Sequence, residues 1–148
     1  IYAIGDVINT PMLAHVATRE GELAIQHISG KNITPINNHN IPNAIYAKPK
    51  VASFGFTEKE LMAKKIPYKK SSSFYKANSK AIATNQDEGM IKILIDEKTN
   101  YILGAHIIGA QATEIIHTLL LVKSNNLTLD ALKTIILAHP TCSEIVHI

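Results

Sequence analysis

The chain has 148 residues, of which 46% are hydrophobic and 18% charged, a composition typical of one ordinary soluble domain with room for a fragment of another. Its formal net charge of +3 comes from scattered lysines rather than from a basic stripe interleaved with aromatic side chains, which argues against nucleic-acid binding. The apolar runs are too short to span a bilayer, no signal peptide is visible, and the single cysteine excludes a disulfide within the chain. Because Ile1 opens the chain inside a predicted strand, without an initiator Met, we expect a piece of a longer protein.

The first segment predicts a short strand that ends in an acidic residue. Ile1 to Ile4 form an apolar run typical of a buried strand, and Asp6 follows at its carboxyl end. Open α/β sheets bind their ligands outside the carboxyl ends of the strands. Asp6 therefore either accepts hydrogen bonds from sugar-like hydroxyl groups or simply forms a turn.

A helix is predicted to follow this strand. Thr10 is expected to cap it and Pro11 to occupy its first helical position, and Ser29-Gly30 is expected to end it. Its first N–H groups, at Met12 to Ala14, would point back toward the strand end. A helix N-terminus of this kind favours negative charge.

The next stretch, residues 31–50, is rich in Asn and Pro and predicts a turn-rich linker. We therefore place the domain boundary here, with one domain over residues 1–40 and a second over residues 41–148. His39 has no partner histidine or cysteine at metal-ligand spacing, so we interpret it as a loop residue rather than a metal ligand.

The second domain is predicted to be α+β, with an antiparallel sheet flanked by helices. The pattern predicts strands at 51–56, 68–75, 90–96 and 101–108, a helix from a capping box at Thr57 to Ile66, a short helix or loop at 78–85, and helices over 111–123 and from Thr128 toward Ala138. The helix over 111–123 has a broad apolar surface, which belongs to the core or packs against a second subunit. His106 alternates with apolar residues, which favours a structural role over a catalytic one.

The stretch from His139 to Glu144 holds the candidate chemistry. A neutral imidazole accepts a proton near neutral pH, and a carboxylate nearby orients it and stabilises its charged form. Pro140 disfavours helix at His139 and favours a turn there. Thr141 and Glu144 also match a helix capping box, which is the simpler explanation on spacing alone. A thiol nucleophile at Cys142 is the weakest alternative, because most lone cysteines are buried and inert.

Three stretches resemble the flavin-dependent pyridine-nucleotide disulfide oxidoreductases. They are Tyr-Ala-Ile-Gly-Asp-Val with Pro-Met-Leu-Ala-His and Glu-Gly near the start, Gly-Ala-His-Ile-Ile-Gly at 104–109, and His-Pro-Thr-Cys-Ser-Glu at 139–144. The Met12 to His15 run is similar to the dihydrolipoamide dehydrogenases within that family. Ala47 and Lys50 differ from the residues that the family carries where its dimerisation domain begins. Lys50 stands in place of a carboxylate, which puts in doubt a charge pair at that position.

The resemblance implies a set of binding and catalytic residues. Asp6 would bind the ribitol of FAD, and Met12, Leu13, Ala14 and His15 would line its isoalloxazine ring, although His15 taken alone is more typical of a structural histidine. His139 would be the acid/base that deprotonates a substrate thiol, and Glu144 would hold it. NAD would bind to a domain that this chain does not contain.

The resemblance also implies the biological setting. It predicts a homodimer that oxidises dihydrolipoamide to lipoamide with NAD reduction, partnered by the lipoyl domains of 2-oxoacid dehydrogenase complexes in the bacterial cytoplasm or the mitochondrial matrix. The chain by itself is expected to be inactive and to end before the dimerisation domain is complete. Two alternatives remain open: a disulfide reductase for another substrate such as glutathione, and a non-catalytic dimerisation module.

Overall fold

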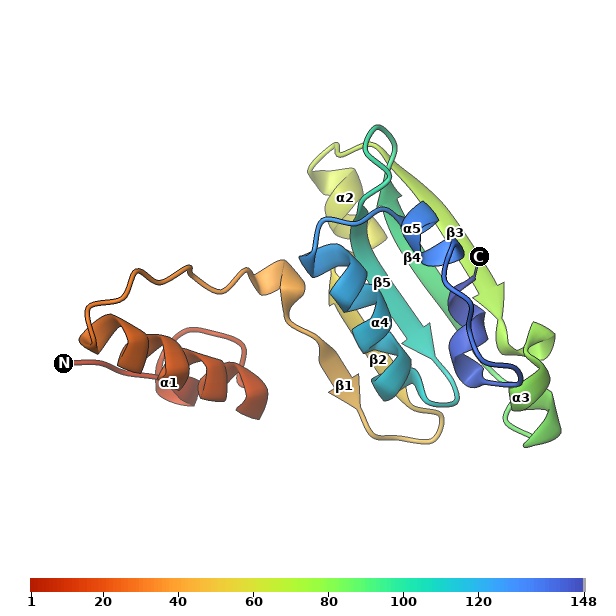
Figure 1. Cartoon of the computed structure of the whole chain (residues 1–148), viewed down its shortest axis with the longest axis horizontal. Helices are drawn as coiled ribbons and strands as arrows, with labels where there is room; N and C mark the ends of the chain where they lie inside the picture. Colours follow the sequence, from red (N-terminus) through yellow and green to blue (C-terminus); the bar gives the residue numbers. More distant parts are fainter. Residues whose placement is uncertain (148) are drawn as a thin grey trace. The chain divides into compact units, whose positions relative to one another are not determined.

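The computed structural model of the chain describes residues 1–147, and they divide into two compact units (Figure 1). The first unit comprises residues 1–38 and the second begins at His39. This division lies close to the linker boundary after residue 40 that the Asn and Pro content predicts.

The first unit contains a single turn of 3-10 helix, η1 (Gly5–Val7), and one long helix, α1 (Ala14–Ile28). The predicted strand at residues 1–4 is wrong, because Ile4 has extended dihedral angles but no strand among the described residues pairs with it. A strand is stabilised by a hydrogen-bonded ladder with a neighbour, and an apolar run without one stays irregular. Asp6 therefore lies in η1 and not at the end of a strand.

The start of α1 also differs from the prediction. The helix begins at Ala14 and not at Pro11, and Leu13 rather than Thr10 occupies its N-cap position, without a side-chain cap. The backbone N–H groups of Thr10 and Leu13 instead donate to carbonyl oxygens two residues back, each over 2.8 Å. Tight turns thus use the backbone groups that a first helical turn would need. The predicted end at Ser29-Gly30 is confirmed, where Gly30 has a φ of +79°.

The second unit is built on a five-stranded antiparallel sheet with the strand order β1-β2-β5-β4-β3 (Figure 1). Its strands are β1 (Asn43–Ile45), β2 (Val51–Gly55), β3 (Tyr68–Phe74), β4 (Met90–Asp96) and β5 (Ile102–Ile108). The predicted α+β class with an antiparallel sheet is confirmed, as is the hairpin formed by β4 and β5.

Short helices connect these strands, and one longer helix covers the sheet. They are α2 (Glu58–Ala63), α3 (Ser79–Ala83), α4 (Ala112–Ser124) and α5 (Leu129–Lys133), with 3-10 turns η2 (Asn38–Asn40), η3 (Tyr75–Ala77) and η4 (Cys142–Val146). The predicted capping box at Thr57 is confirmed: its hydroxyl accepts the Glu60 N–H, and the Glu60 carboxylate accepts the Thr57 N–H.

The helix predicted from Thr128 toward Ala138 is shorter than expected, because α5 ends at Lys133. Its continuation would gain little from burial, since Ile135 and Ile136 are 50% and 96% exposed. The residues after Lys133 therefore run as an irregular segment that leads to His139.

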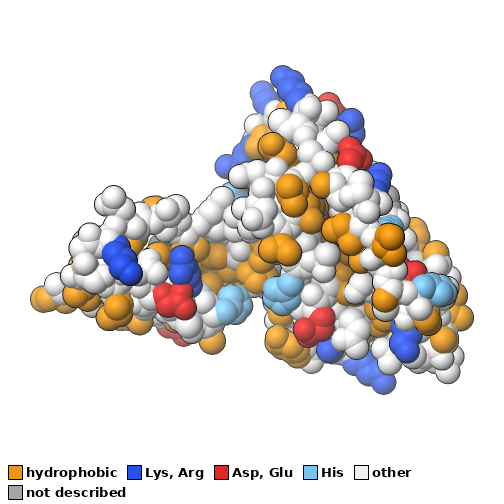
Figure 2. All heavy atoms as spheres, in the orientation of Figure 1, with side chains coloured by type: hydrophobic (Ala, Val, Ile, Leu, Met, Phe, Trp, Pro, Cys, Tyr) orange, Lys and Arg blue, Asp and Glu red, His pale blue; other side chains and the backbone are white. Residues whose placement is uncertain are grey.

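The core lies between the sheet and α4, which packs against β5 and β2. Phe54, Ile93 and Ile107 from the sheet are each at most 1% exposed, and Ile116 and Leu119 from α4 are fully buried. The broad apolar surface predicted for α4 is thus mostly core. Some hydrophobic side chains nevertheless reach the surface of this unit on the face that carries α4 (Figure 2).

Candidate active site

The imidazole of His139 and the carboxylate of Glu144 lie in contact near the end of the chain. His139 Nδ1 is 2.9 Å from Glu144 Oε1, with the imidazole side chain 66% exposed and the carboxylate side chain 28% exposed. An ionised carboxylate can only accept hydrogen bonds, so Nδ1 carries the proton and donates it. Nε2 is therefore the nitrogen that keeps a lone pair in the neutral imidazole.

The second oxygen of Glu144 serves the backbone. Oε2 accepts the N–H of Thr141 at 2.7 Å, which is the carboxylate half of the predicted capping box. This backbone hydrogen bond is the main reason that the pKa of Glu144 lies below its usual range, and the hydrogen bond from His139 adds to it. Capping and imidazole binding are consequently not alternatives here, because each uses a different oxygen of the same carboxylate.

The lowered pKa of Glu144 predicts how stability should depend on pH. Because its folded-state pKa is depressed, the carboxylate stabilises the fold above its unfolded-state pKa, and this contribution disappears as the pH falls through the folded-state pKa. Glu144→Gln should therefore lower the free energy of unfolding near neutral pH and lose most of this effect once the pH falls below the lowered pKa of Glu144. Urea unfolding of both proteins near neutral pH and in strong acid checks this. An equal difference at both would show that the charge is not involved.

The surroundings of Cys142 disfavour a reactive thiol. It begins η4 and packs against the hydrophobic core, and burial raises the pKa of its thiol. A raised pKa opposes formation of the thiolate that a nucleophile requires. The buried side chains of Ile145 and Val146, 3% and 1% exposed, follow it and anchor η4 in the core.

Two histidines outside this segment, His106 and His39, have structural surroundings. His106 Nε2 lies 3.1 Å from the carbonyl oxygen of Phe56, and burial lowers the pKa of His106. His39 stacks on the Phe56 ring, with 3.8 Å between the ring centroids. Over residues 1–147, no group of three His, Cys, Asp or Glu side chains is arranged to hold a metal ion.

The five residues predicted to bind flavin lie in the first unit: Asp6 in η1, Met12 and Leu13 just before α1, and Ala14 and His15 at the start of α1. Asp6, Met12, Ala14 and His15 are exposed, while Leu13 is half-buried. The turn that carries Asp6 is tied to α1, because the N–H of Gly5 donates to Glu20 Oε2 at 2.6 Å. Their exposure leaves these side chains accessible to a ligand.

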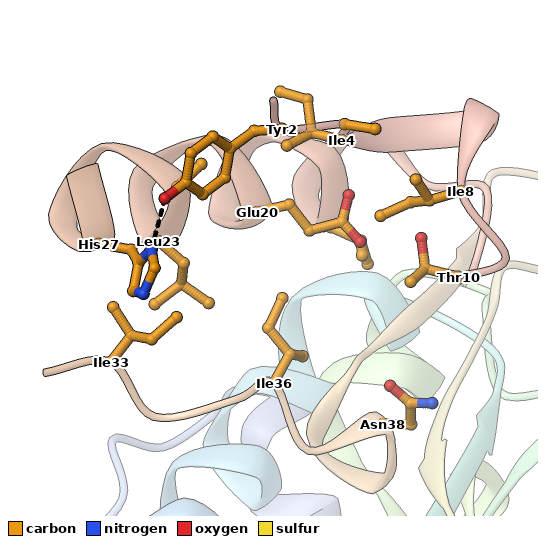
Figure 3. A pocket seen from close by; sticks show the side chains of 13 residues that line it. Tyr2, Ile4, Ile8, Thr10, Glu20, Leu23, His27, Ile33, Ile36 and Asn38 are labelled. Carbon is orange, nitrogen blue, oxygen red and sulfur yellow. Dashed lines mark hydrogen bonds between the residues drawn. The ribbon is translucent and has the colours of Figure 1, made fainter.

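A cavity of about 480 Å³ in the first unit lies apart from this set (Figure 3). Aliphatic side chains from the chain start, from α1 and from the segment after it contribute most of its lining, together with Glu20 and Thr10. Tyr2 and His27 hydrogen-bond to each other at its edge. None of the five predicted flavin residues lines this cavity.

The sequence predictions do not include Asn78 among the site residues, although it contacts the segment that carries His139. Asn78, at the start of α3, is only 5% exposed and donates from Nδ2 to the carbonyl oxygen of Thr141 at 3.0 Å. The sequence indicates a short polar helix near Asn78, and an Asn before such a helix is a recognisable cap. Its contact with Thr141, 63 positions away, has no local signal.

A family comparison accounts for most of this chain. Residues 41–148 match the family model described as "Pyridine nucleotide-disulphide oxidoreductase, dimerisation domain". The chain belongs to this family. The family and the α+β dimerisation-domain fold that the sequence motifs predict are confirmed.

Curated members of the family resemble the chain over almost its full length. The dihydrolipoyl dehydrogenase of Rhizobium etli is 40% identical over 145 residues, which cover 97% of this chain and 30% of that protein. The dihydrolipoyl dehydrogenase of Mycoplasma genitalium is 42% identical over 147 residues, covering 99% of this chain and 32% of that protein. The chain thus spans about a third of the length of these relatives.

Two solved structures share the fold. LpdA from Mycobacterium tuberculosis has a TM-score of 0.93 at 23% identity, over 99% of this chain and 32% of that chain. The flavoprotein disulfide reductase RclA from Escherichia coli has a TM-score of 0.90 at 22% identity, over 98% and 34%. None of the helices described over residues 1–147 has the length and apolar character needed to cross a membrane.

Proposed function

We propose that this chain supplies the acid/base pair and the homodimer contacts of a flavoprotein that oxidises dihydrolipoamide with reduction of NAD. The observation that carries the proposal is the 2.9 Å contact between His139 Nδ1 and Glu144 Oε1, in a chain whose curated relatives include dihydrolipoyl dehydrogenases. The dimerisation-domain family supports a homodimer. Residues 1–40 would then close the flavin-binding domain, and residues 41–148 would form the dimerisation domain.

The pair can perform one proton transfer. His139 Nε2 accepts the proton of a substrate thiol, and the thiolate then attacks a disulfide sulfur, because the thiolate and not the thiol is the nucleophile in thiol–disulfide exchange. The Glu144 carboxylate holds the ring by Nδ1 and stabilises its protonated form. The chain has one cysteine, so the disulfide belongs to another part of the flavoprotein.

The accessible residues of the first unit suit a bound FAD. The exposed Asp6 carboxylate would accept hydrogen bonds from the ribitol, while the segment from Met12 to His15 would lie along the isoalloxazine ring. When bound, FAD relays electrons between a dithiol and NAD. A carboxylate and one helix start bind weakly without a dinucleotide-binding fold, so the chain alone would be inactive.

The proposed partners and location follow from the same assignment. The lipoyl domains of 2-oxoacid dehydrogenase complexes would present the dihydrolipoamide. The curated relatives include bacterial proteins and the mitochondrial "Dihydrolipoyl dehydrogenase 1" of Arabidopsis thaliana, which agrees with either the bacterial cytoplasm or the mitochondrial matrix.

The substrate is tested on the complete flavoprotein, meaning the full-length protein that contains these residues. We expect NAD reduction by dihydrolipoamide and no oxidation of NADPH by glutathione disulfide, measured as the change in nicotinamide absorbance. Turnover with glutathione disulfide alone would keep the disulfide-reductase chemistry and replace the substrate. If the protein retained FAD but showed neither activity, the non-catalytic dimerisation module would be favoured.

A further inference from the structure

Asn78 is one of two polar side chains that the structure buries in the described part of the chain, the other being Thr113. Burying a carboxamide is unfavourable unless both of its ends are hydrogen-bonded. Asn78 meets this condition: Oδ1 accepts the N–H of Ala81 at 2.9 Å, and Nδ2 donates to the carbonyl oxygen of Thr141 at 3.0 Å. A backbone N–H only donates and a carbonyl only accepts, so the two ends of the carboxamide have separate tasks.

The two tasks concern different parts of the fold. Oδ1 caps helix α3, which is a local role that Ser, Asp or Asn can each fill. Nδ2 reaches the segment that carries His139, where it donates to the Thr141 carbonyl. The capping role explains a polar residue here, but it does not explain the second contact.

Thr141 passes this contact on to the acid/base pair. Its carbonyl oxygen is held by Asn78, its N–H donates to Glu144 Oε2 at 2.7 Å, and its hydroxyl donates to the carbonyl oxygen of Ala138 at 2.8 Å. Glu144 in turn holds His139. A chain of hydrogen bonds therefore leads from the buried carboxamide to the imidazole.

We propose that Asn78 is a positioning residue that fixes the His139–Glu144 pair through the Thr141 carbonyl. The proposal rests on the proposed acid/base function. Without the Nδ2 donor, the Thr141 carbonyl loses its hydrogen bond to Asn78, and the backbone of Thr141 is no longer fixed at this point. The Thr141 N–H, which belongs to the preceding peptide group, then shifts relative to Glu144 Oε2, and the carboxylate no longer holds the ring in one orientation. A displacement of about 1 Å at a catalytic group lowers a rate by up to ~100-fold.

Asn78→Ser in the complete flavoprotein separates the two tasks, because serine still caps a helix but does not reach Thr141. Thr57→Ala is the matched control, since it removes an N-cap of the same domain, on α2, away from the pair. We expect Asn78→Ser to lower kcat for dihydrolipoamide about tenfold or more, with an unchanged FAD absorbance spectrum. The acid limb of its kcat–pH profile should also shift to lower pH, because a displaced carboxylate stabilises the protonated imidazole less. Thr57→Ala should lower the thermal midpoint only.

A double-mutant cycle with His139→Gln tests whether Asn78 acts through the imidazole. Asn78→Ser should have no further effect on kcat in the His139→Gln background. Additive effects, or a kcat–pH profile that Asn78→Ser leaves unchanged, would overturn the positioning role and leave a helix cap. If His139→Gln alone kept full turnover, the proposed acid/base function would fail independently. Should Asn78→Ser not fold, Asn78→Asp is the second variant, because it keeps the cap and places an oxygen against the Thr141 carbonyl.

Discussion

Replacing His139 with Gln in the complete flavoprotein is expected to lower kcat for dihydrolipoamide oxidation by about 10²- to 10⁴-fold, the usual contribution of a positioned acid/base. Glutamine fills similar space and still donates a hydrogen bond, but it cannot accept and release a proton near neutral pH. The 2.9 Å contact with Glu144 holds the ring by Nδ1 and leaves Nε2 for the substrate. Steady-state turnover with dihydrolipoamide and NAD measures the loss.

His117→Gln is the matched control for this variant. His117 is an exposed histidine on α4 that takes no part in the proposed chemistry, so its replacement should leave kcat within about twofold. The FAD content and dimeric state of both variants should equal those of the parent. Full turnover by His139→Gln would instead assign the residues from Thr141 to Glu144 to helix capping alone.

Gly104→Ala is expected to be strongly destabilising. A Cβ on Gly104 would lie 2.1 Å from the carbonyl oxygen of Phe56 and 2.9 Å from its nitrogen. These neighbours are backbone atoms, and the Phe56 N–H also donates to the carbonyl oxygen of Leu103, so no flexible side chain can move aside. Overpacking of this kind typically costs 1–3 kcal/mol and here should reach about 3 kcal/mol or more.

Gly21→Ala serves as the control for Gly104→Ala. In helix α1, a Cβ on Gly21 would meet only the end of the Ile4 side chain, at 3.4 Å. Alanine favours helix over glycine by up to ~1 kcal/mol, so this variant should be neutral or slightly more stable. Urea unfolding measures both free energies. If the two variants were equally stable, the close approach of β5 to the residues after β2 would be wrong.

Local patterns were enough to predict most of the second unit. Alternation and apolar runs identify β2, β3, β4 and β5, and Thr57 with Glu60 marks the start of α2, because each pattern depends on neighbours in the chain. The contact between His139 and Glu144 is predictable for the same reason, since only five positions separate them.

The failures concern features that depend on distant partners or on burial. Residues 1–4 have the composition of a strand, but a strand also requires a neighbour, and none of the described residues provides one. The helix from Thr128 stops at Lys133, because Ile135 and Ile136 beyond it stay exposed. Asn78 illustrates the same limit within the candidate site, where a cap is visible in the sequence and the hydrogen bond to Thr141 is not.

In the proposed acid/base function, the placement of Glu144 on the Nδ1 side of His139 determines how charge would be arranged when a substrate thiol loses its proton. Before the transfer, the only charge among the three groups is the carboxylate. Afterwards the imidazolium lies between two anions, with Glu144 at Nδ1 and the new thiolate at Nε2. The total charge is unchanged, but the signs now alternate along a line of three groups. Each negative charge then has a positive neighbour at hydrogen-bonding distance, so the thiolate forms beside a compensating charge instead of in isolation.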